Sequence, residues 1–422
     1  MKIALIADLH LNRNLYKGVM DKEFPELPFR ACDFMRAFRF AVDKNIDEIK
    51  PNLIVILGDI YDTYDPSNPI RAFFNQQVKK ILDAQIPIII LSGNHDVCGR
   101  HSSLSPIHAL GLKHVKIIET PKMVPYQNKL LMLFPFSMEV ERSEIEIREQ
   151  FHNFIDECHK KIEATPDYQG KEILFFGHFG VKGAVLNSYG CSMSSAPPIT
   201  EFDKAKKVLV NKNEGDISLN DLDTIGASHI FLGDYHQHQL LPCKNVKAAF
   251  YIGSLEKGDY SEKNQKKGFA VYDDTIIPGV HGQYYFVENT TCRPMIELEG
   301  TYDQMVKSFN EQKEAKKALV KLNFEGNDKE LLEYSIQLDD FKKKIENKFE
   351  PVYVITQQKV IDNEEEKEAS QVEQNILNKG QVEDSDVLQV VEETIREKES
   401  DPEEQDLLLK MAKEVYEETK DK

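Results

Sequence analysis

Five short polar motifs, each placed directly after an apolar run, most constrain the fold of this 422-residue chain. The apolar runs are KIALIA, LIVIL, IPIIILS, EILFF and HIFL, and such runs are typical of buried strands. Helical patterns alternate with the strands, which predicts an α/β core whose ligands collect beyond the carboxyl ends of the strands. The motifs are, in chain order, Asp8-Leu9-His10, Gly58-Asp59-Ile60-Tyr61-Asp62, Gly93-Asn94-His95-Asp96, Gly177-His178 and Gly233-Asp234-Tyr235-His236.

The side chains of these motifs suit a site that holds two metal ions. They supply imidazoles, carboxylates and one carboxamide, and no thiolate is among them. A pair of divalent ions needs such a supply of nitrogen and oxygen ligands, delivered by strand ends to one edge of a sheet. Any one motif alone is common in a turn after a strand. Their joint occurrence on one rim indicates a dinuclear site.

The order and residue types of the motifs resemble those of the calcineurin-like metallophosphoesterases. A later stretch, from Gly253-Ser254 through Glu262 to Lys267-Gly268-Phe269, is similar to the SbcD-type nuclease branch. The resemblance is dense over residues 1–275 and only architectural beyond them. It implies an α/β fold, a calcineurin-like metallophosphoesterase sandwich of two mixed sheets flanked by helices. It also implies a metal-dependent DNA nuclease, acting as exonuclease or endonuclease in DNA repair, recombination or replication.

The resemblance implies how the motif residues would share two divalent ions. Asp59 would bridge them, and Mn²⁺ is the expected metal, with Mg²⁺, Fe²⁺ or Co²⁺ as substitutes. The remaining implied ligands are Asp8, His10 and His236 for one ion, and Asn94, His178 and Asp234 for the other.

Three further motif residues are implied to act on the substrate. His95 would reach the scissile phosphate and serve as general acid or electrostatic stabiliser. Asp96 would fix the tautomer of His95. Asp62 would lie near the substrate or support the ligands.

One motif departs from the family pattern. The last motif usually has His where this chain has Asp234. A carboxylate is a competent ligand, and we expect a working site that favours Mn²⁺ or Mg²⁺. The alternative is a shift of register in which His236 and His238 supply the two ligands.

The chain is too long for one ordinary core. We expect a nuclease domain over residues 1–290, a small αβ capping domain over 291–358, a linker over 359–384 and a C-terminal helix pair over 385–422. The helix pair carries two apolar stripes that it cannot bury alone. It either clasps a partner or docks on its own protein; the resemblance favours the base of an SbcC-like coiled-coil ABC-type ATPase.

The charge distribution bears on DNA binding. The net charge is −18, but 21 acidic and 8 basic residues lie from Asp362 onward, so the first 361 residues carry only −5. Phosphate neutralisation needs lysine and arginine, so tight binding of DNA is expected to require a basic partner. The chain has no GxxxxGK[ST] phosphate loop, so ATP hydrolysis is also expected from a partner.

The resemblance implies a homodimer formed through helices after the second and third motifs. One such helix offers an apolar face that would either make this contact or pack in the core. The residues of that face are Ile70, Phe73, Phe74, Val78 and Ile81.

Several classes of protein are disfavoured by composition. Six scattered cysteines without a CxxC pair indicate reduced thiols, and no apolar run approaches the ~18–20 residues of a membrane span. We expect a protein of the bacterial or phage-infected cytoplasm, without a secretion signal or membrane contact. Two rival functions remain: a metallophosphoesterase acting on a nucleotide or other non-DNA phosphoester, and a metal-free scaffold that tethers an ATPase.

Overall fold

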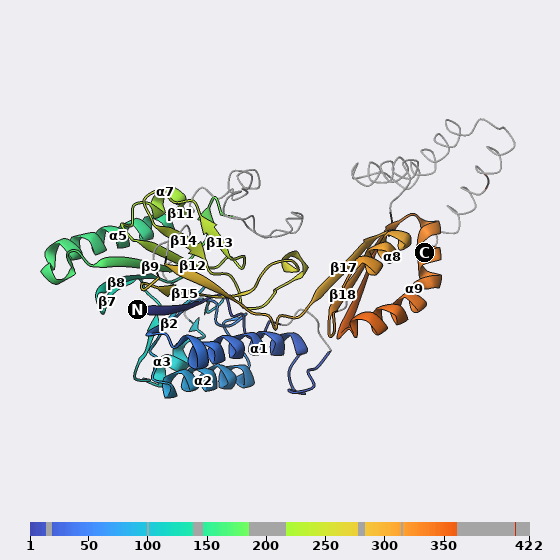
Figure 1. The fold of residues 1–422 in the computed structure, drawn as a ribbon, viewed down its shortest axis with the longest axis horizontal. Helices are drawn as coiled ribbons and strands as arrows, with labels where there is room; N and C mark the ends of the chain where they lie inside the picture. The colour runs from blue at the N-terminus through green and yellow to red at the C-terminus, as the bar shows by residue number, and fades with distance from the viewer. Residues whose placement is uncertain are drawn as a thin grey trace. The chain divides into compact units, whose positions relative to one another are not determined.

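The computed structural model describes residues 1–13, 19–98, 101–137, 147–184, 217–276, 283–313, 315–360 and 410. These residues fall into two compact units (Figure 1). The first comprises Met1–Leu298, Gln312–Leu322 and Lys342–Ile355, and the second comprises Glu299–Glu311, Asn323–Phe341 and the described part of Thr356–Lys422. All five motifs lie in the first unit.

One mixed sheet of six strands forms around the N-terminal strand. Its strands are, in spatial order, β16 (Tyr284–Glu288), β15 (Gly268–Asp273), β1 (Lys2–Ile6), β2 (Leu53–Leu57), β3 (Ile88–Leu91) and β6 (Val115–Ile118). The four strands from β1 to β6 run parallel, whereas β15 and β16 add antiparallel neighbours. The carboxyl ends of β1, β2 and β3 therefore reach the same edge.

A second mixed sheet of six strands has the same design. Its strands are, in spatial order, β13 (Gln239–Leu241), β14 (Ala248–Tyr251), β12 (His229–Gly233), β9 (Glu172–His178), β8 (Lys129–Phe134) and β7 (Lys122–Tyr126). The central four strands are parallel and the two edge strands are antiparallel. The register pairs Gly233 with His178, which brings two motifs side by side.

The described helices and short strands of the first unit lie between these strands in the chain. The helices are α1 (Phe29–Lys44), the π-helical turn η1 (Asn45–Ile49), α2 (Asn68–Asp83), α3 (Ser105–Ala109), α5 (Ile147–Ala164), η2 (Pro166–Tyr168), α7 (Leu219–Leu222) and η5 (Tyr260–Glu262). The short strands are β4 (Val97–Cys98), β5 (His101–Ser102), β10 (Val181–Lys182) and β11 (Ile217–Ser218). None of the described helices is both long and apolar enough to cross a membrane.

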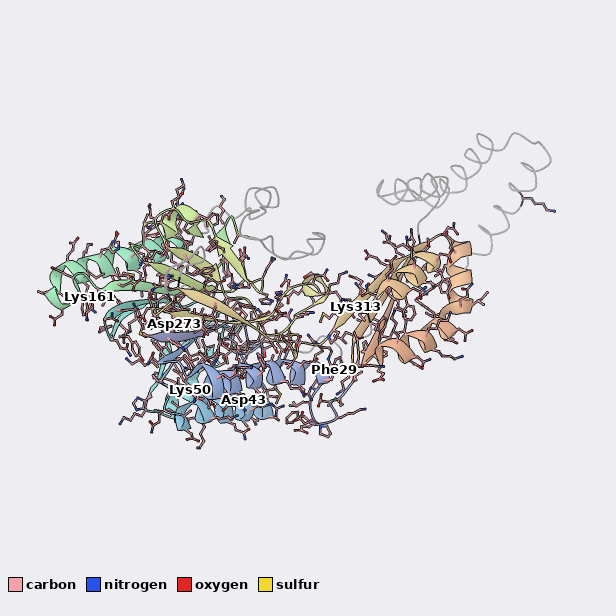
Figure 2. All side chains as sticks on the ribbon, viewed as in Figure 1. Phe29, Asp43, Lys50, Lys161, Asp273 and Lys313 are labelled. Carbon is pink, nitrogen blue, oxygen red and sulfur yellow. The ribbon has the colours of Figure 1, made fainter. Side chains whose placement is uncertain are left out.

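The inner strands of each large sheet are buried on both faces, which explains their unbroken apolar runs. Along β1, Ile3 and Leu5 face the other sheet, whereas Ala4 and Ile6 pack against α1 and α2. The outer face of the second sheet packs against α5 and α7 in the same way. Figure 1 shows these helices on opposite sides of the paired sheets, and Figure 2 shows charged side chains such as Lys161 on the outside. The layers therefore run helix, sheet, sheet, helix, and the predicted sandwich is confirmed.

The apolar face of α2 belongs to the core. All five of its residues are buried, and the ring of Phe74 stacks on Phe38 of α1 with centroids 5.6 Å apart. The face is therefore not exposed to a second copy of the chain, and the suggestion that it forms a homodimer contact is wrong. Core packing, the alternative, is what the structure has.

The segment after Thr291 alternates strands and helices. They are β17 (Met295–Gly300), α8 (Tyr302–Glu311), β18 (Leu319–Gly326), α9 (Asp328–Phe349) and β19 (Tyr353–Val360), and the sheet order is β17-β18-β19. In the second unit, Phe341 contacts the rings of Tyr302 and Phe309. The predicted linker beyond Val360 and the predicted helix pair lie outside the described residues, apart from Lys410.

Candidate metal centre

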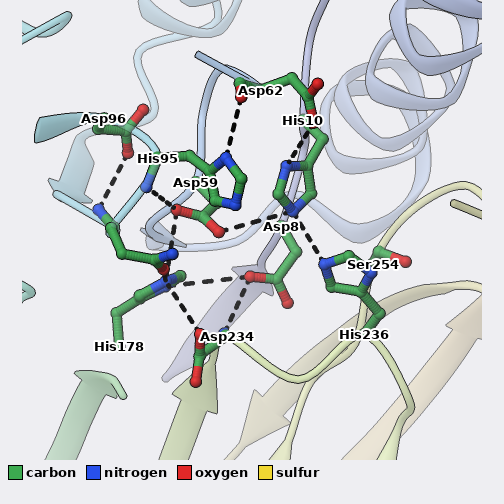
Figure 3. Close-up of polar contacts among 12 residues, drawn as sticks. Asp8, His10, Asp59, Asp62, His95, Asp96, His178, Asp234, His236 and Ser254 are labelled. Atoms are coloured by element: carbon green, nitrogen blue, oxygen red, sulfur yellow. Dashed lines mark hydrogen bonds and ion pairs between the residues drawn. The ribbon is translucent and has the colours of Figure 1, made fainter. Parts of the chain in front are cut away.

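The five motifs meet where the carboxyl ends of both large sheets come together. The first three follow β1, β2 and β3, the fourth ends β9, and the fifth begins at the last residue of β12. Figure 3 shows their side chains converging from these separate segments. The motif residues labelled there are Asp8, His10, Asp59, Asp62, His95, Asp96, His178, Asp234 and His236.

The backbone is strained at four of these positions. Asp8, His10, Asp59 and Asp234 have φ angles of 50°, 41°, 50° and 97°, in the left-handed region that L-residues rarely adopt. Such a conformation costs about 1–3 kcal/mol per residue and persists at functional sites where the surroundings enforce it. The strain turns the side chains from the strand ends toward one another.

Two glycines allow the motifs to approach closely. Gly58 has a φ of 88°, and a Cβ there would collide with Nδ1 of His178. A Cβ on Gly93 would collide with Oδ1 and the backbone nitrogen of Asp59. The Gly-Asp and Gly-Asn pairs of the motifs therefore have a steric reason.

The Asp59 carboxylate lies between two histidines. Its Oδ1 is 3.4 Å from Nε2 of His178, and its Oδ2 is 3.5 Å from Nε2 of His10. Burial opposes ionisation of Asp59, but the neighbouring His178 outweighs burial and holds its pKa below the usual range. Two groups of donor atoms are close enough to hold an ion, namely His10 with Asp59 and His95, and Asp8 with Asp59 and His178. Asp59 is common to both.

Hydrogen bonding assigns the tautomer of His178. Its Nδ1 donates to the carbonyl oxygen of Leu57 at 2.6 Å, which turns Nε2 toward the centre. That atom lies 3.0 Å from Oδ1 of Asn94 and 4.0 Å from Oδ1 of Asp234. Burial disfavours charge on His178, yet the pKa rises to about 10, chiefly because of Asp59. Without an ion, Nε2 therefore carries a proton at neutral pH.

His10 and His236 direct nitrogens at the same point. Their Nε2 atoms are 2.9 Å apart. The Nδ1 of His10 is 3.2 Å from Oδ1 of Asp62, and the Nδ1 of His236 donates to Oε1 of Glu262 at 2.8 Å. Burial lowers the pKa of His10, whereas Glu262 overcomes burial and raises the pKa of His236. The shared proton therefore belongs to His236, in a place where a divalent ion could replace it.

An unsatisfied carboxylate oxygen tests whether a cation fits. Asp8 is fully buried, and its Oδ1 accepts the backbone N–H of Asp234 at 3.0 Å. Its Oδ2 has no hydrogen-bond partner among the described residues. Buried polar atoms are rarely left unpaired, and a divalent ion would satisfy this one. Burial also raises the pKa of Asp234 to about 6, a cost that a nearby cation would remove.

Asp96 has a different role from the one expected. Its carboxylate accepts the backbone N–H groups of Ile60, Tyr61 and Gly93 at 3.0–3.2 Å. The Nδ1 of His95 is instead 2.9 Å from the carbonyl oxygen of Asp62. Asp96 therefore ties together the loops after β2 and β3, and the suggestion that it fixes the tautomer of His95 is corrected: the backbone of Asp62 makes that contact.

The structure also bears on the alternative register for the last motif. The Nδ1 of His238 faces the carbonyl oxygens of Tyr251 and Ile252, and its Nε2 is 2.8 Å from the Tyr284 hydroxyl. Burial lowers the pKa of His238 to about 4. Both ring nitrogens are thus engaged away from the centre, which favours Asp234 for the ligand position.

Sequence reasoning assigned no role to two buried residues near His236. They are Glu262, whose carboxylate contacts the His236 ring, and Lys267, whose Nζ lies 2.7 Å from Oε2 of Glu262. Both lie in the stretch that resembles the nuclease branch. The resemblance of that stretch to the nuclease branch indicated that it belongs with the site, but only the tertiary structure shows which side chain each residue contacts.

The sequence comparisons agree with this geometry. A model of the calcineurin-like phosphoesterase family matches residues 1–226, which include four of the five motifs. The chain is also similar to the SbcD component of the nuclease SbcCD from Staphylococcus epidermidis, with 24% identity over 316 residues, or 72% of this chain and 74% of the relative.

Two solved structures give a weaker likeness. TT1561 of Thermus thermophilus has 11% identity and a TM-score of 0.34, covering 64% of this chain and 93% of that one. A cold-active protein-tyrosine phosphatase of a psychrophilic Shewanella has 13% identity and a TM-score of 0.26, covering 68% of this chain and 80% of that one. TM-scores this low carry no conclusion about shared fold or function.

Proposed function

Because this chain belongs to the calcineurin-like phosphoesterase family, we propose that it is a metal-dependent DNA nuclease that hydrolyses phosphodiester bonds with two divalent ions. The family makes it a phosphoesterase that depends on metal. The step to DNA rests on the similarity to the SbcD component of an SbcCD nuclease. It also rests on the stretch from Gly253 to Phe269, which supplies the Glu262 that contacts His236.

One observation carries the proposal, namely the place of Asp59 between two sets of donor atoms. One carboxylate oxygen lies 3.4 Å from a nitrogen of His178, and the other lies 3.5 Å from a nitrogen of His10. A single carboxylate in this position suits a bridge between two ions. We assign the other ligands as Asp8, His10 and His236 for one ion, and Asn94, His178 and Asp234 for the other.

The chemistry of the donor set favours Mn²⁺. Carboxylate, carboxamide and imidazole ligands suit Mn²⁺, and Mg²⁺, Fe²⁺ or Co²⁺ are admissible substitutes. When bound, two such ions would lower the pKa of water and offset negative charge on the phosphate. The residues of the chain would orient both ions and exclude bulk water.

His95 is the proposed residue that acts on the substrate. Its backbone N–H donates to Oδ1 of Asp59 at 2.9 Å, which places it beside the bridge. Its Nδ1 donates to the carbonyl oxygen of Asp62, so the Nε2–H of the imidazolium form is the one left to donate a proton to the phosphate or the leaving oxygen. Asp62 also approaches His10 and Arg13, so we propose that Asp62 supports both this ligand and the substrate edge.

The proposed partners are DNA, an SbcC-like ATPase and a second copy of the chain. Residues 385–422 are the proposed clasp for the ATPase. The segment from Asp362 onward is not expected to bind DNA, because 21 of its residues are acidic and only 8 are basic. A homodimer would have to use a surface other than the buried face of α2.

The test compares two substrates with one protein. We expect the Mn²⁺-loaded protein, purified with and without a co-expressed SbcC-like ATPase, to digest linear duplex DNA. A small chromogenic phosphodiester should be hydrolysed by both preparations, whereas ATP should stimulate only the digestion of DNA by the complex. Hydrolysis of the small ester or of a nucleotide, with duplex DNA left intact in both preparations, would favour the non-DNA phosphoesterase. Asp59→Asn is the inactive control.

A further inference from the structure

His236 is held from behind by a buried carboxylate. The hydrogen bond from its Nδ1 to Oε1 of Glu262 is 2.8 Å long, and Glu262 is 3% exposed. Because this bond keeps a proton on Nδ1, an ion that displaces the proton shared with His10 would meet the lone pair of Nε2, the atom that faces His10. A histidine that ligates a metal usually donates its other nitrogen in this manner.

Glu262 is itself fixed on its far side. Its Oε2 accepts the backbone N–H of Gly258 at 2.6 Å and lies 2.7 Å from Nζ of Lys267. Lys267 is 2% exposed, and its Nζ also donates to the carbonyl oxygen of His236 and to Oγ of Ser254, each at 2.9 Å. One ammonium thus holds both the backbone of His236 and the carboxylate that orients its ring.

The ion pair between Glu262 and Lys267 also determines how much charge Glu262 adds to the metal centre. A lone buried carboxylate would add negative charge close to the site and would be costly to bury. Opposite Lys267, Glu262 contributes no net charge, so the carboxylates of Asp8, Asp59 and Asp234 remain the ones that balance the ions. Glu262 can therefore set geometry without changing the charge of the centre.

We propose that Glu262, held by Lys267, is a positioning residue that presents Nε2 of His236 to one of the two ions. This inference rests on the metal centre of the proposed function. It assigns the stretch from Gly253 to Phe269 a physical task, because Ser254, Gly258, Glu262 and Lys267 together form the support behind one ligand.

The test measures binding of Mn²⁺ by calorimetry, with the absorption spectrum of bound Co²⁺ as a second readout. We expect Glu262→Gln to weaken one of two binding steps by about 10- to 100-fold and to leave the other unchanged. Glu262→Asp, which keeps the charge opposite Lys267 but is one methylene shorter, should weaken the same step. It provides the answer if Glu262→Gln proves unable to fold.

The matched control is Glu256→Gln in the same loop. Glu256 is 2% exposed, and its Oε1 accepts the backbone N–H of Lys257 at 2.9 Å. A purely structural effect of losing a buried carboxylate would appear in both variants as a lower melting temperature, with Mn²⁺ binding unchanged. That result would overturn the proposal.

A double-mutant cycle gives a second criterion. If Glu262 acts through His236, adding Glu262→Gln to His236→Ala should cause no further loss of Mn²⁺ affinity. Additive losses would overturn the proposal, since they would mean that Glu262 acts elsewhere. A wild-type chain that binds no Mn²⁺ would refute the metal centre itself. If the wild type and Glu262→Gln both bind Mn²⁺ with the same affinity, only the role of Glu262 is refuted.

Discussion

His95 contacts the centre through its backbone as well as its ring. The backbone N–H binds Asp59, so Asp59 keeps this bond when the imidazole is removed. We predict that His95→Ala retains both ions and DNA binding while turnover falls by about 10²-fold or more, the usual contribution of a positioned acid. Metal analysis and single-turnover digestion measure the two effects. If His95→Ala instead loses an ion, the His95 ring is itself a metal ligand, a role that its position beside His10 and Asp59 allows.

His178 makes metal binding dependent on pH. Its pKa is raised to about 10 in the metal-free protein, so Nε2 is protonated at about pH 8, where a histidine with the ordinary pKa of ~6.5 is neutral. An ion must displace that proton. We predict that Mn²⁺ binding releases about one proton through His178 and strengthens as the pH rises toward about 10.

The release is measured by calorimetry in two buffers of different ionisation enthalpy. A binding enthalpy that does not depend on the buffer would contradict the assignment of His178 as a ligand. His178→Ala is the control, and it should bind less Mn²⁺ and release fewer protons.

Among the elements, the junction after β2 has the tightest steric requirement. Gly58 has a positive φ, and a Cβ there would meet the His178 ring. Gly111 also has a positive φ, of 57°, but a Cβ there would meet nothing within 4 Å. Alanine at Gly111 would therefore add backbone strain alone, whereas alanine at Gly58 would add strain and a collision with His178.

We predict that Gly58→Ala destabilises the protein by more than the about 1–3 kcal/mol of backbone strain and lowers Mn²⁺ affinity, because His178 must move. Gly111→Ala should show the strain alone and bind Mn²⁺ normally. Denaturant unfolding and Mn²⁺ titration of both variants test this. Equal effects in the two variants would mean that the approach of Gly58 to His178 is not required.

Elements with two buried faces could be predicted from sequence, and edge elements could not. β1, β2 and β3 are buried on both sides, so continuous apolar runs mark them. The edge strands β7 and β16 are partly exposed, and their pairing with β8 and β15 decides their structure. The helix after β1 is α-helical from Phe29 to Lys44, and its last turn is π-helical from Asn45 to Ile49, a change that the sequence pattern does not reveal.

The same distinction applies to the site. Sequence order placed the motifs at strand ends, and topology then brings them together. The sequence could not show which residues these side chains contact, because tertiary structure alone defines such partners. Examples are Glu262 for His236 and the backbone N–H groups for Asp96. For this reason the ligand types were predictable, but the contacts that orient them were not.

For the whole molecule, we expect chemistry and partner binding to reside in different parts of the chain. The candidate centre lies within the first 298 residues, whereas the acidic residues concentrate after Asp362. We predict that truncation after Val360, where β19 ends, leaves a folded, metal-loaded phosphodiesterase. It should hydrolyse a small chromogenic phosphodiester normally but fail to co-purify with the ATPase, and ATP should no longer stimulate cutting of DNA.

A pull-down with full-length and truncated chains measures capture of the ATPase. Digestion with and without ATP then measures the coupling. Undiminished capture by the truncated chain would show that residues 385–422 dock on their own protein.

The most direct test of the dinuclear centre is the metal content of the wild-type chain and of Asp59→Asn after loading with Mn²⁺. Asp59 is the one carboxylate shared by both groups of donor atoms, so its neutralisation should affect both ions. We predict about two ions per chain in the wild type and loss of most of them in Asp59→Asn. A wild-type content near zero would contradict a metal-dependent function altogether, and an unchanged content in Asp59→Asn would contradict the bridge.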